Sequence, residues 1–114
     1  MEATATGKYL KGSPQKARLV VDLIRGRNVQ EALAILRASR RRSARLVVKV
    51  LQSAIANAEQ KDAAADLDNF YVSEAFVNLG PTKSRFRLRP APMGRAFRER
   101  RRQSHITIKI SDER

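Results

Sequence analysis

The strongest constraint on how this chain can fold is a block of positive charge in its C-terminal third. Residues 80–102 hold nine Lys or Arg side chains and one acidic residue, which gives the segment eight of the thirteen formal positive charges of the chain. Its few apolar side chains cannot bury enough surface to hold it together in water. We therefore predict that a polyanion orders it. Nucleic acid is the expected partner, because each cation placed on a phosphate releases condensed counterions.

Charge is also unevenly spread along the rest of the chain. Residues 1–36 sum to +3, residues 37–49 to +6 without a single acid, and residues 50–79 to −4. Two basic blocks that flank an acidic one indicate an oriented molecule, with one surface toward phosphates and another away from them. The acids fit no calcium-loop spacing, so we expect them to form a solvated face away from the nucleic acid.

Size and composition exclude several classes of protein. A chain of 114 residues predicts one domain, and the absence of Cys excludes disulfide and thiolate-metal scaffolds. No apolar run reaches membrane-spanning length, and the first residues do not resemble a signal peptide. The chain has one His, no Ser-His-Asp arrangement and no glycine-rich phosphate loop, so we expect neither an enzyme nor a cofactor nor a metal ion.

Three helices are predicted in the first half of the chain, each from an apolar repeat of about 3.6 residues. The first begins where the hydroxyl of Ser13 can cap it and where Pro14 suits the first helical position. It ends near Gly26, which is favoured where a left-handed residue closes a helix. The second begins at Asn28, and Glu31 three residues later resembles a capping box.

The third predicted helix is longer and runs from about Arg42 to Gln60. Cations gather in its N-terminal half, where the helix dipole disfavours positive charge unless an external anion lies close by. That placement favours a bound ligand. We expect its apolar face to comprise Ala44, Val47, Val48, Leu51, Ile55 and Ala58.

Three strands are predicted around these helices. Residues 70–79 are rich in β-branched and aromatic side chains, and Ile106, Ile108 and Ile110 alternate with polar residues as in a half-buried strand. Residues 3–10 are expected to supply a third strand. Residues 61–69 form an acidic, alanine-rich connection.

The basic segment between the two stronger strands has the pattern of a hairpin. Pro90, Pro92 and Gly94 lie at its middle and are typical turn residues. With arms of nine or ten residues at roughly 3.3 Å per residue, the hairpin would protrude by about 30 Å. Phe86 and Phe97 in its arms are expected either to pack on each other or to stack on bases.

Several motifs resemble the bacterial large-subunit ribosomal protein L-twenty-two family. The stretches 13–26 and 53–59 carry the resemblance in the first half of the chain. It continues through Gly80-Pro81, Arg85-Phe86-Arg87, Met93-Gly94-Arg95-Ala96 and Ser104-His105-Ile106-Thr107. The resemblance implies an α+β fold in which three helices pack on a small three-stranded antiparallel sheet, with a long protruding basic β-hairpin. It implies one ribosomal-protein domain, with a globular core of residues 1–79 and 103–114 and an extended hairpin of residues 80–102.

The same resemblance implies a non-catalytic structural constituent of the large ribosomal subunit in the cytoplasm. Such a protein would bind large-subunit rRNA and aid subunit assembly, and its hairpin tip would help line the polypeptide exit tunnel. The implied partners are rRNA, neighbouring large-subunit proteins and the nascent polypeptide, with no membrane contact and no homo-oligomer. The tunnel-facing tip would comprise Leu88, Arg89, Pro90, Ala91, Pro92, Met93, Gly94 and Arg95.

Candidate RNA-binding residues follow from the basic blocks and from the start of the first helix, since a helix N-terminus also attracts anions. His105 joins them, because a strand histidine of this kind is expected to hydrogen-bond to backbone or to phosphate. The candidates are Lys8, Lys11, Lys16, Arg18, Arg25, Arg40, Arg41, Arg42, Arg45, Lys49, Lys83, Arg85, Arg87, Arg89, Arg95, Arg98, Arg100, Arg101, Arg102 and His105.

Two other binding classes compete with rRNA. A long basic β-ribbon with proline near its tip can also enter a DNA groove, although such proteins usually bind as symmetric dimers. A cationic protein at a membrane surface is the third class, but the arm lacks the apolar face that interfacial burial needs. Gel-filtration mass and a competition between DNA and rRNA would separate the first two.

Overall fold

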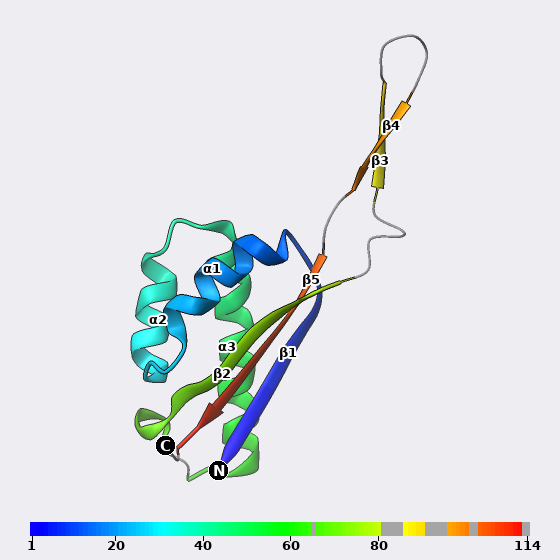
Figure 1. The fold of residues 1–114 in the computed structure, drawn as a ribbon. Coiled ribbons are helices and arrows are strands. Elements are labelled where there is room, and N and C mark those ends of the chain that lie inside the picture. The colour runs from blue at the N-terminus through cyan, green and yellow to red at the C-terminus, as the bar shows by residue number, and fades with distance from the viewer. Residues whose placement is uncertain (65, 81–85, 91–95, 101–102, 113–114) are drawn as a thin grey trace.

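A computed structural model describes residues 1–64, 66–80, 86–90, 96–100 and 103–112. Its elements form a helical layer on a sheet, with a separate two-stranded ribbon (Figure 1). In chain order they are β1 (Glu2–Lys11), α1 (Pro14–Ile24), α2 (Val29–Ala38), α3 (Arg42–Lys61), the 3-10 turn η1 (Leu67–Asn69), β2 (Tyr71–Leu79), β3 (Phe86–Pro90), β4 (Ala96–Arg100) and β5 (Gln103–Ser111).

The sheet is antiparallel with the order β1-β5-β2, so the last strand lies in its centre. Ile106, Ile108 and Ile110 of β5 are completely buried and point toward the helices, as their alternation predicted. The three helices cover this one face of the sheet (Figure 1). The predicted α+β class and all three predicted core strands are confirmed, including β1.

The predicted hairpin is present as a second sheet made of β3 and β4. These antiparallel strands have five residues each, with Phe86 opposite Arg100 and Pro90 opposite Ala96. They stand away from the core in Figure 1, and the molecule measures 65 × 25 × 18 Å along its principal axes. Several predicted arm and tip residues lie outside the described residues, namely Lys83, Arg85, Ala91, Pro92, Met93, Gly94, Arg95, Arg101 and Arg102.

The predicted start and end of α1 are correct, but its cap is not the one expected. Pro14 occupies the first helical turn, and Gly26 has the left-handed φ of +74° that its position predicted. The hydroxyl of Ser13 makes no capping hydrogen bond. Instead the backbone carbonyl of Ser13 accepts a hydrogen bond from the N–H of Ala17, 3.2 Å away.

Asn28 caps α2 as predicted, with a different donor. Its side-chain oxygen accepts from the backbone N–H of Gln30 at 2.9 Å, which is one residue before Glu31 of the expected capping box. The amide nitrogen of Asn28 donates to the carbonyl of Asp68 at 2.8 Å. The cap therefore also ties α2 to η1, a partner far away in the sequence.

Helix α3 has the predicted bounds to within one residue, but its set of buried residues differs from the predicted apolar face. Val50 and Ala54 are buried and were missed, whereas Val48 and Ile55 are only partly buried. The reason is that α3 packs against β1 and β5 on one side and against α1 and α2 on another. Two contact surfaces widen the buried stripe beyond the single face that a helical repeat predicts.

Candidate nucleic-acid interface

The basic cluster at the start of α3 is open to a ligand. Its five cations are exposed, and none of their side chains makes an ion pair or hydrogen bond to any described residue. The first turn of α3 holds no acid, and Arg41 at the N-cap position makes no side-chain cap. Unpaired cations at the positive end of a helix dipole repel one another unless an anion is present. The cluster comprises Arg40, Arg41, Arg42, Arg45 and Lys49.

A second group of cations surrounds the start of α1. Lys8 and Lys11 on β1 and Lys16 on the first turn of α1 are exposed and form no ion pair with any described residue. Figure 1 shows the starts of α1 and of α3 at the end of the core from which the hairpin leaves. The tertiary structure thus brings the cations around the start of α1 and the basic cluster at the start of α3, which are separate in the sequence, to one end of the core.

Two predicted RNA-binding residues have other partners in the fold. Arg18 donates from Nε and Nη2 to the carbonyl of Val77, at 3.2 and 3.0 Å. Arg25 donates from Nε to the carbonyl of Ala75 at 2.7 Å and pairs through Nη1 with Asp22. Both guanidinium groups therefore hold α1 against the outer edge of β2, a role that sequence reasoning missed.

The outer edge of β1 is covered in a similar way by α3, but only in part. Asn57 donates to the carbonyl of Thr4 and Lys61 donates to that of Glu2, each at 2.9 Å. Farther along the same face of α3, Ser53 and Lys49 donate to no described carbonyl.

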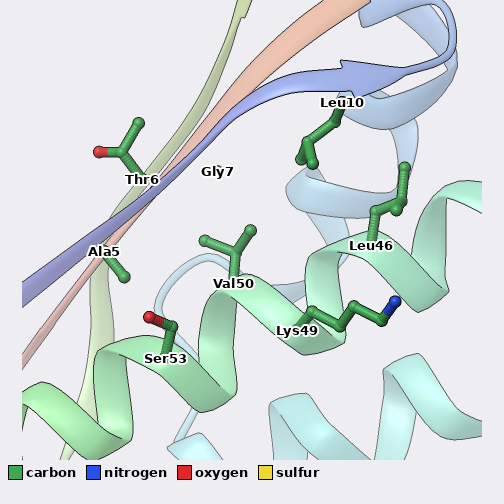
Figure 2. Close-up of a pocket in the computed structure, with 8 residues that line it drawn as sticks. All are labelled: Ala5, Thr6, Gly7, Leu10, Leu46, Lys49, Val50 and Ser53. Atoms are coloured by element: carbon green, nitrogen blue, oxygen red, sulfur yellow. The ribbon is translucent and has the colours of Figure 1, made fainter.

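A pocket of about 180 Å³ opens at that point, next to the basic cluster. Figure 2 shows that Leu10 from β1 and Leu46 from α3 point into the space between the two elements. The full lining is Ala5, Thr6, Gly7, Leu10, Leu46, Lys49, Val50 and Ser53. The lining is mostly apolar, with Lys49 connecting it to the cations of α3.

His105 faces away from the helices, on the uncovered side of the sheet. Its Nδ1 accepts a hydrogen bond from the backbone N–H of Tyr9 at 3.0 Å, so it uses backbone, one of the two expected kinds of partner. The rings of Tyr9 and His105 meet edge to face, with centroids 5.0 Å apart and planes at 88°. The only sequence feature that indicates this contact is an aromatic residue between two lysines of the strand.

The acidic residues lie at the opposite end of the core. Asp62 and Asp66 accept hydrogen bonds from nearby backbone N–H groups of Ala64 and Asp68, so they close turns in the connection from α3 to β2. Figure 1 places this connection far from the hairpin. Within the described ranges, no group of three His, Cys, Asp or Glu side chains could hold a metal ion. The fold thus places the acidic connection and the basic cluster of α3 at opposite ends of the core, which is consistent with the oriented molecule that the charge pattern indicates.

Two ion pairs connect the start of β1 to the end of β5 at this acidic end. Lys109 lies 3.1 Å from a carboxylate oxygen of Glu2, and this hydrogen bond, with the charge of Glu2, raises the pKa of Lys109. Asp112 accepts from the amino group of Met1 at 2.8 Å, which lowers the pKa of its carboxyl. Both pairs lie at the surface, at the end of the sheet away from the hairpin.

The chain is similar to known proteins over nearly its whole length. The profile of the family described as "Ribosomal protein L22p/L17e" matches residues 5–111. A protein named large ribosomal subunit protein uL22 from Solibacter usitatus is 52% identical over 113 residues, which cover 99% of this chain and 98% of the relative. The protein of the same name from Geobacter metallireducens is 50% identical, over 99% of this chain and 100% of the relative. The one from Clostridium novyi is 46% identical, over 98% of each chain.

No helix in the described part of the chain is long and apolar enough to span a membrane.

Proposed function

Because the chain belongs to the ribosomal protein L22p/L17e family, we propose that the basic end of its core and its hairpin form one continuous rRNA-binding surface. The protein is a structural, non-enzymatic constituent of the large ribosomal subunit in the cytoplasm, where rRNA and other ribosomal proteins are its partners.

One observation supports the proposal, namely that a group of cations without an ionic partner and a group of carboxylates lie at opposite ends of the core. The five exposed cations of the basic cluster at the start of α3, together with Lys8, Lys11 and Lys16, have no ionic partner among the described residues and lie at the hairpin end. The carboxylates of the connecting segment lie at the other end. A surface of one sign, aligned with a basic ribbon, attracts a phosphate backbone and positions the molecule on it.

The arrangement supports a passive mechanism. The core would dock on rRNA through the cations of α3 and β1, and the hairpin would insert between rRNA segments as they assemble. Arginine predominates over lysine in the hairpin, and its planar fork suits bidentate contact with phosphates. The tip, residues 88–95, would reach the exit tunnel and pass close to the nascent polypeptide. One copy would act alone, without forming a homo-oligomer.

The direct test is the salt dependence of binding to large-subunit rRNA. Replacing Arg41, Arg42, Arg45 and Lys49 together by Gln should flatten the slope of log K against log salt concentration by about three units, since each lost phosphate contact removes roughly 0.7–0.9. Replacing Arg85, Arg87, Arg98 and Arg101 together should have an effect of similar size.

The control is Lys61→Gln, because Lys61 lies at the acidic end and is bonded to the carbonyl of Glu2. Its slope should match that of the wild type. An unchanged slope in both fourfold variants would contradict the proposal. Competition with duplex DNA at the same salt concentration would distinguish folded rRNA from nucleic acid in general.

A further inference from the structure

Tyr9 combines an unfavourable backbone with an exposed ring. Its φ is +58°, the only positive φ of a non-glycine residue in the described part of the chain. A left-handed backbone is unfavourable at such a residue, because its Cβ comes too close to the following carbonyl oxygen. The side chain recovers little of this by burial, because 60% of it is exposed. Strain at an exposed aromatic residue is typical of a binding position rather than of a packing position.

A β-bulge creates this conformation. On β1, Gly7 pairs with Ile106 and Leu10 pairs with Ser104, so that two residues, Lys8 and Tyr9, stand opposite His105 alone. Bulges of this kind redirect a side chain and are common beside functional sites.

His105 on β5 anchors the bulge. The hydrogen bond from the N–H of Tyr9 to Nδ1 of His105 fixes the backbone, and the edge-to-face contact of the rings fixes their mutual orientation. An edge-to-face pair uses one face of only one ring. The ring is thus held in place while most of its surface remains open to solvent.

The surroundings suit a nucleotide. Tyr9 and His105 lie on the uncovered face of the sheet, because Ile106 and its alternate residues point to the helices. Phe76, 41% exposed, stands opposite Thr107 on the same face. The exposed side chain of Lys8 precedes the ring and that of Lys11 follows it, at the end of the sheet where the hairpin leaves.

We propose that Tyr9 is a stacking platform for an unpaired nucleobase of the rRNA, with Lys8 and Lys11 on the adjoining phosphates. Every base presents a π-face, and aromatic side chains on an open sheet are a common means of binding single-stranded RNA. A ring that is already held by His105 loses little conformational freedom on binding. The inference rests on the proposed rRNA binding and adds a base-contacting residue to a surface that is otherwise electrostatic.

The chain offers an unusually clean probe, because it contains no Trp. Tyr9→Trp introduces a single indole at the proposed position, and stacking on a base should quench its fluorescence when large-subunit rRNA is added to saturation. Leu19→Trp is the matched control, because Leu19 is 49% exposed on α1, on the helical side of the sheet. Strong quenching for Tyr9→Trp and weak quenching for Leu19→Trp is expected. Equal quenching in both variants would overturn the inference.

Affinity supplies the second measurement. Tyr9→Asn removes the ring but suits a left-handed backbone, and it should weaken rRNA binding by roughly 5- to 150-fold at constant salt. Tyr9→Phe keeps the ring and should bind within about twofold of the wild type. Neither variant should change the salt slope, because no cation is lost.

The outcomes separate this inference from the proposed function. If Tyr9→Asn binds as tightly as the wild type while the fourfold cation variants lose their salt slope, stacking is wrong and the electrostatic surface stands. If the wild type itself binds with no salt dependence, both are wrong. The fluorescence test remains decisive if Tyr9→Asn folds poorly, because the tryptophan variant retains an aromatic ring.

Discussion

Gly7 shows at the residue scale how closely β1 and α3 approach each other. A Cβ added there would lie 2.8 Å from Cγ2 of Val50 and 2.9 Å from Cδ1 of Leu10. Both distances are too short for carbon atoms in contact, so a side chain at this position would displace the side chains of Val50 and Leu10. Glycine avoids this displacement because it has no Cβ.

Gly7→Ala should lower the free energy of unfolding by about 1–3 kcal/mol, the usual cost of overpacking. Adding Val50→Ala should recover part of this loss, so the double variant should be more stable than the sum of the two single effects predicts. Denaturant unfolding of the four proteins measures this coupling. Strict additivity would show that Val50 is not the residue that excludes the side chain.

At the scale of elements, helical side chains cover the outer edge of β2 and part of the outer edge of β1. Arg18 and Arg25 bond to carbonyls of β2, and backbone bonds of 2.9 Å between Val72 and residues 26 and 27 continue the same edge. Asn57 and Lys61 do the same for β1. Covered edges resist pairing with the edge strands of other chains.

Arg18→Lys should therefore affect stability more than RNA binding. Lysine keeps the charge but cannot donate from two nitrogens to the carbonyl of Val77, so the free energy of unfolding should fall by about 1 kcal/mol. The slope of rRNA affinity against salt should change by less than one unit. Denaturant melts and filter binding measure the two effects. A stable variant with weakened binding would instead assign Arg18 to the RNA.

The ion pair of Glu2 with Lys109 predicts a pH dependence. The pKa of Lys109 is raised above its ordinary 10.5 by the hydrogen bond to Glu2 and by that carboxylate's charge, with a smaller effect of Glu74. A raised pKa means that the pair stabilises the fold below about pH 10.5, and that this contribution is lost as the pH rises through the folded-state pKa.

Melting temperatures of the wild type and Glu2→Gln check this. The wild type should be modestly more stable at pH 8, and the difference should shrink at pH 11 and above, as Lys109 loses its proton. A difference that stays constant between these pH values would mean that the two side chains do not interact in solution. The effect should also weaken in high salt, because the pair is solvent-exposed.

At the scale of the whole molecule, the core and the hairpin are stabilised by different interactions. The core buries a continuous set of apolar side chains from all three helices and from β1, β2 and β5. Strands β3 and β4 form a sheet of their own, and their segment carries eight net positive charges. The hairpin should therefore gain much of its stability from the polyanion that it binds.

Limited trypsin digestion tests this difference. In the free protein, cleavage should occur first within residues 83–102, and the core should persist as a resistant product. Saturating large-subunit rRNA should slow the cleavage at least tenfold, because it shields the arginines and opposes opening of the ribbon. An equally protected hairpin in the free protein would contradict the idea that rRNA stabilises it.

Local sequence patterns were sufficient to predict the helices and strands of the core. The 3.6-residue repeats, Pro14 and Gly26 bound α1 correctly, and alternate isoleucines identified β5, because such features depend on residues that are neighbours in the chain. The charge of residues 80–102 also predicted a polyanionic partner, since phosphate binding follows from charge density. The ribosomal role was implied by the family resemblance of the motifs, not by the charge.

Nonlocal contacts decided the rest. Only the fold shows that Arg18 and Arg25 bond to β2, that α3 buries Val50 and Ala54, and that Tyr9 is held by His105. Each of these depends on an element 20 or more residues away whose position a local pattern does not contain. The sequence alone therefore determined the secondary-structure elements, the charge distribution and the family resemblance. The tertiary structure decided which cations remain available to RNA and left the ring of Tyr9 available as well. The reason is that only packing gives each side chain its partner.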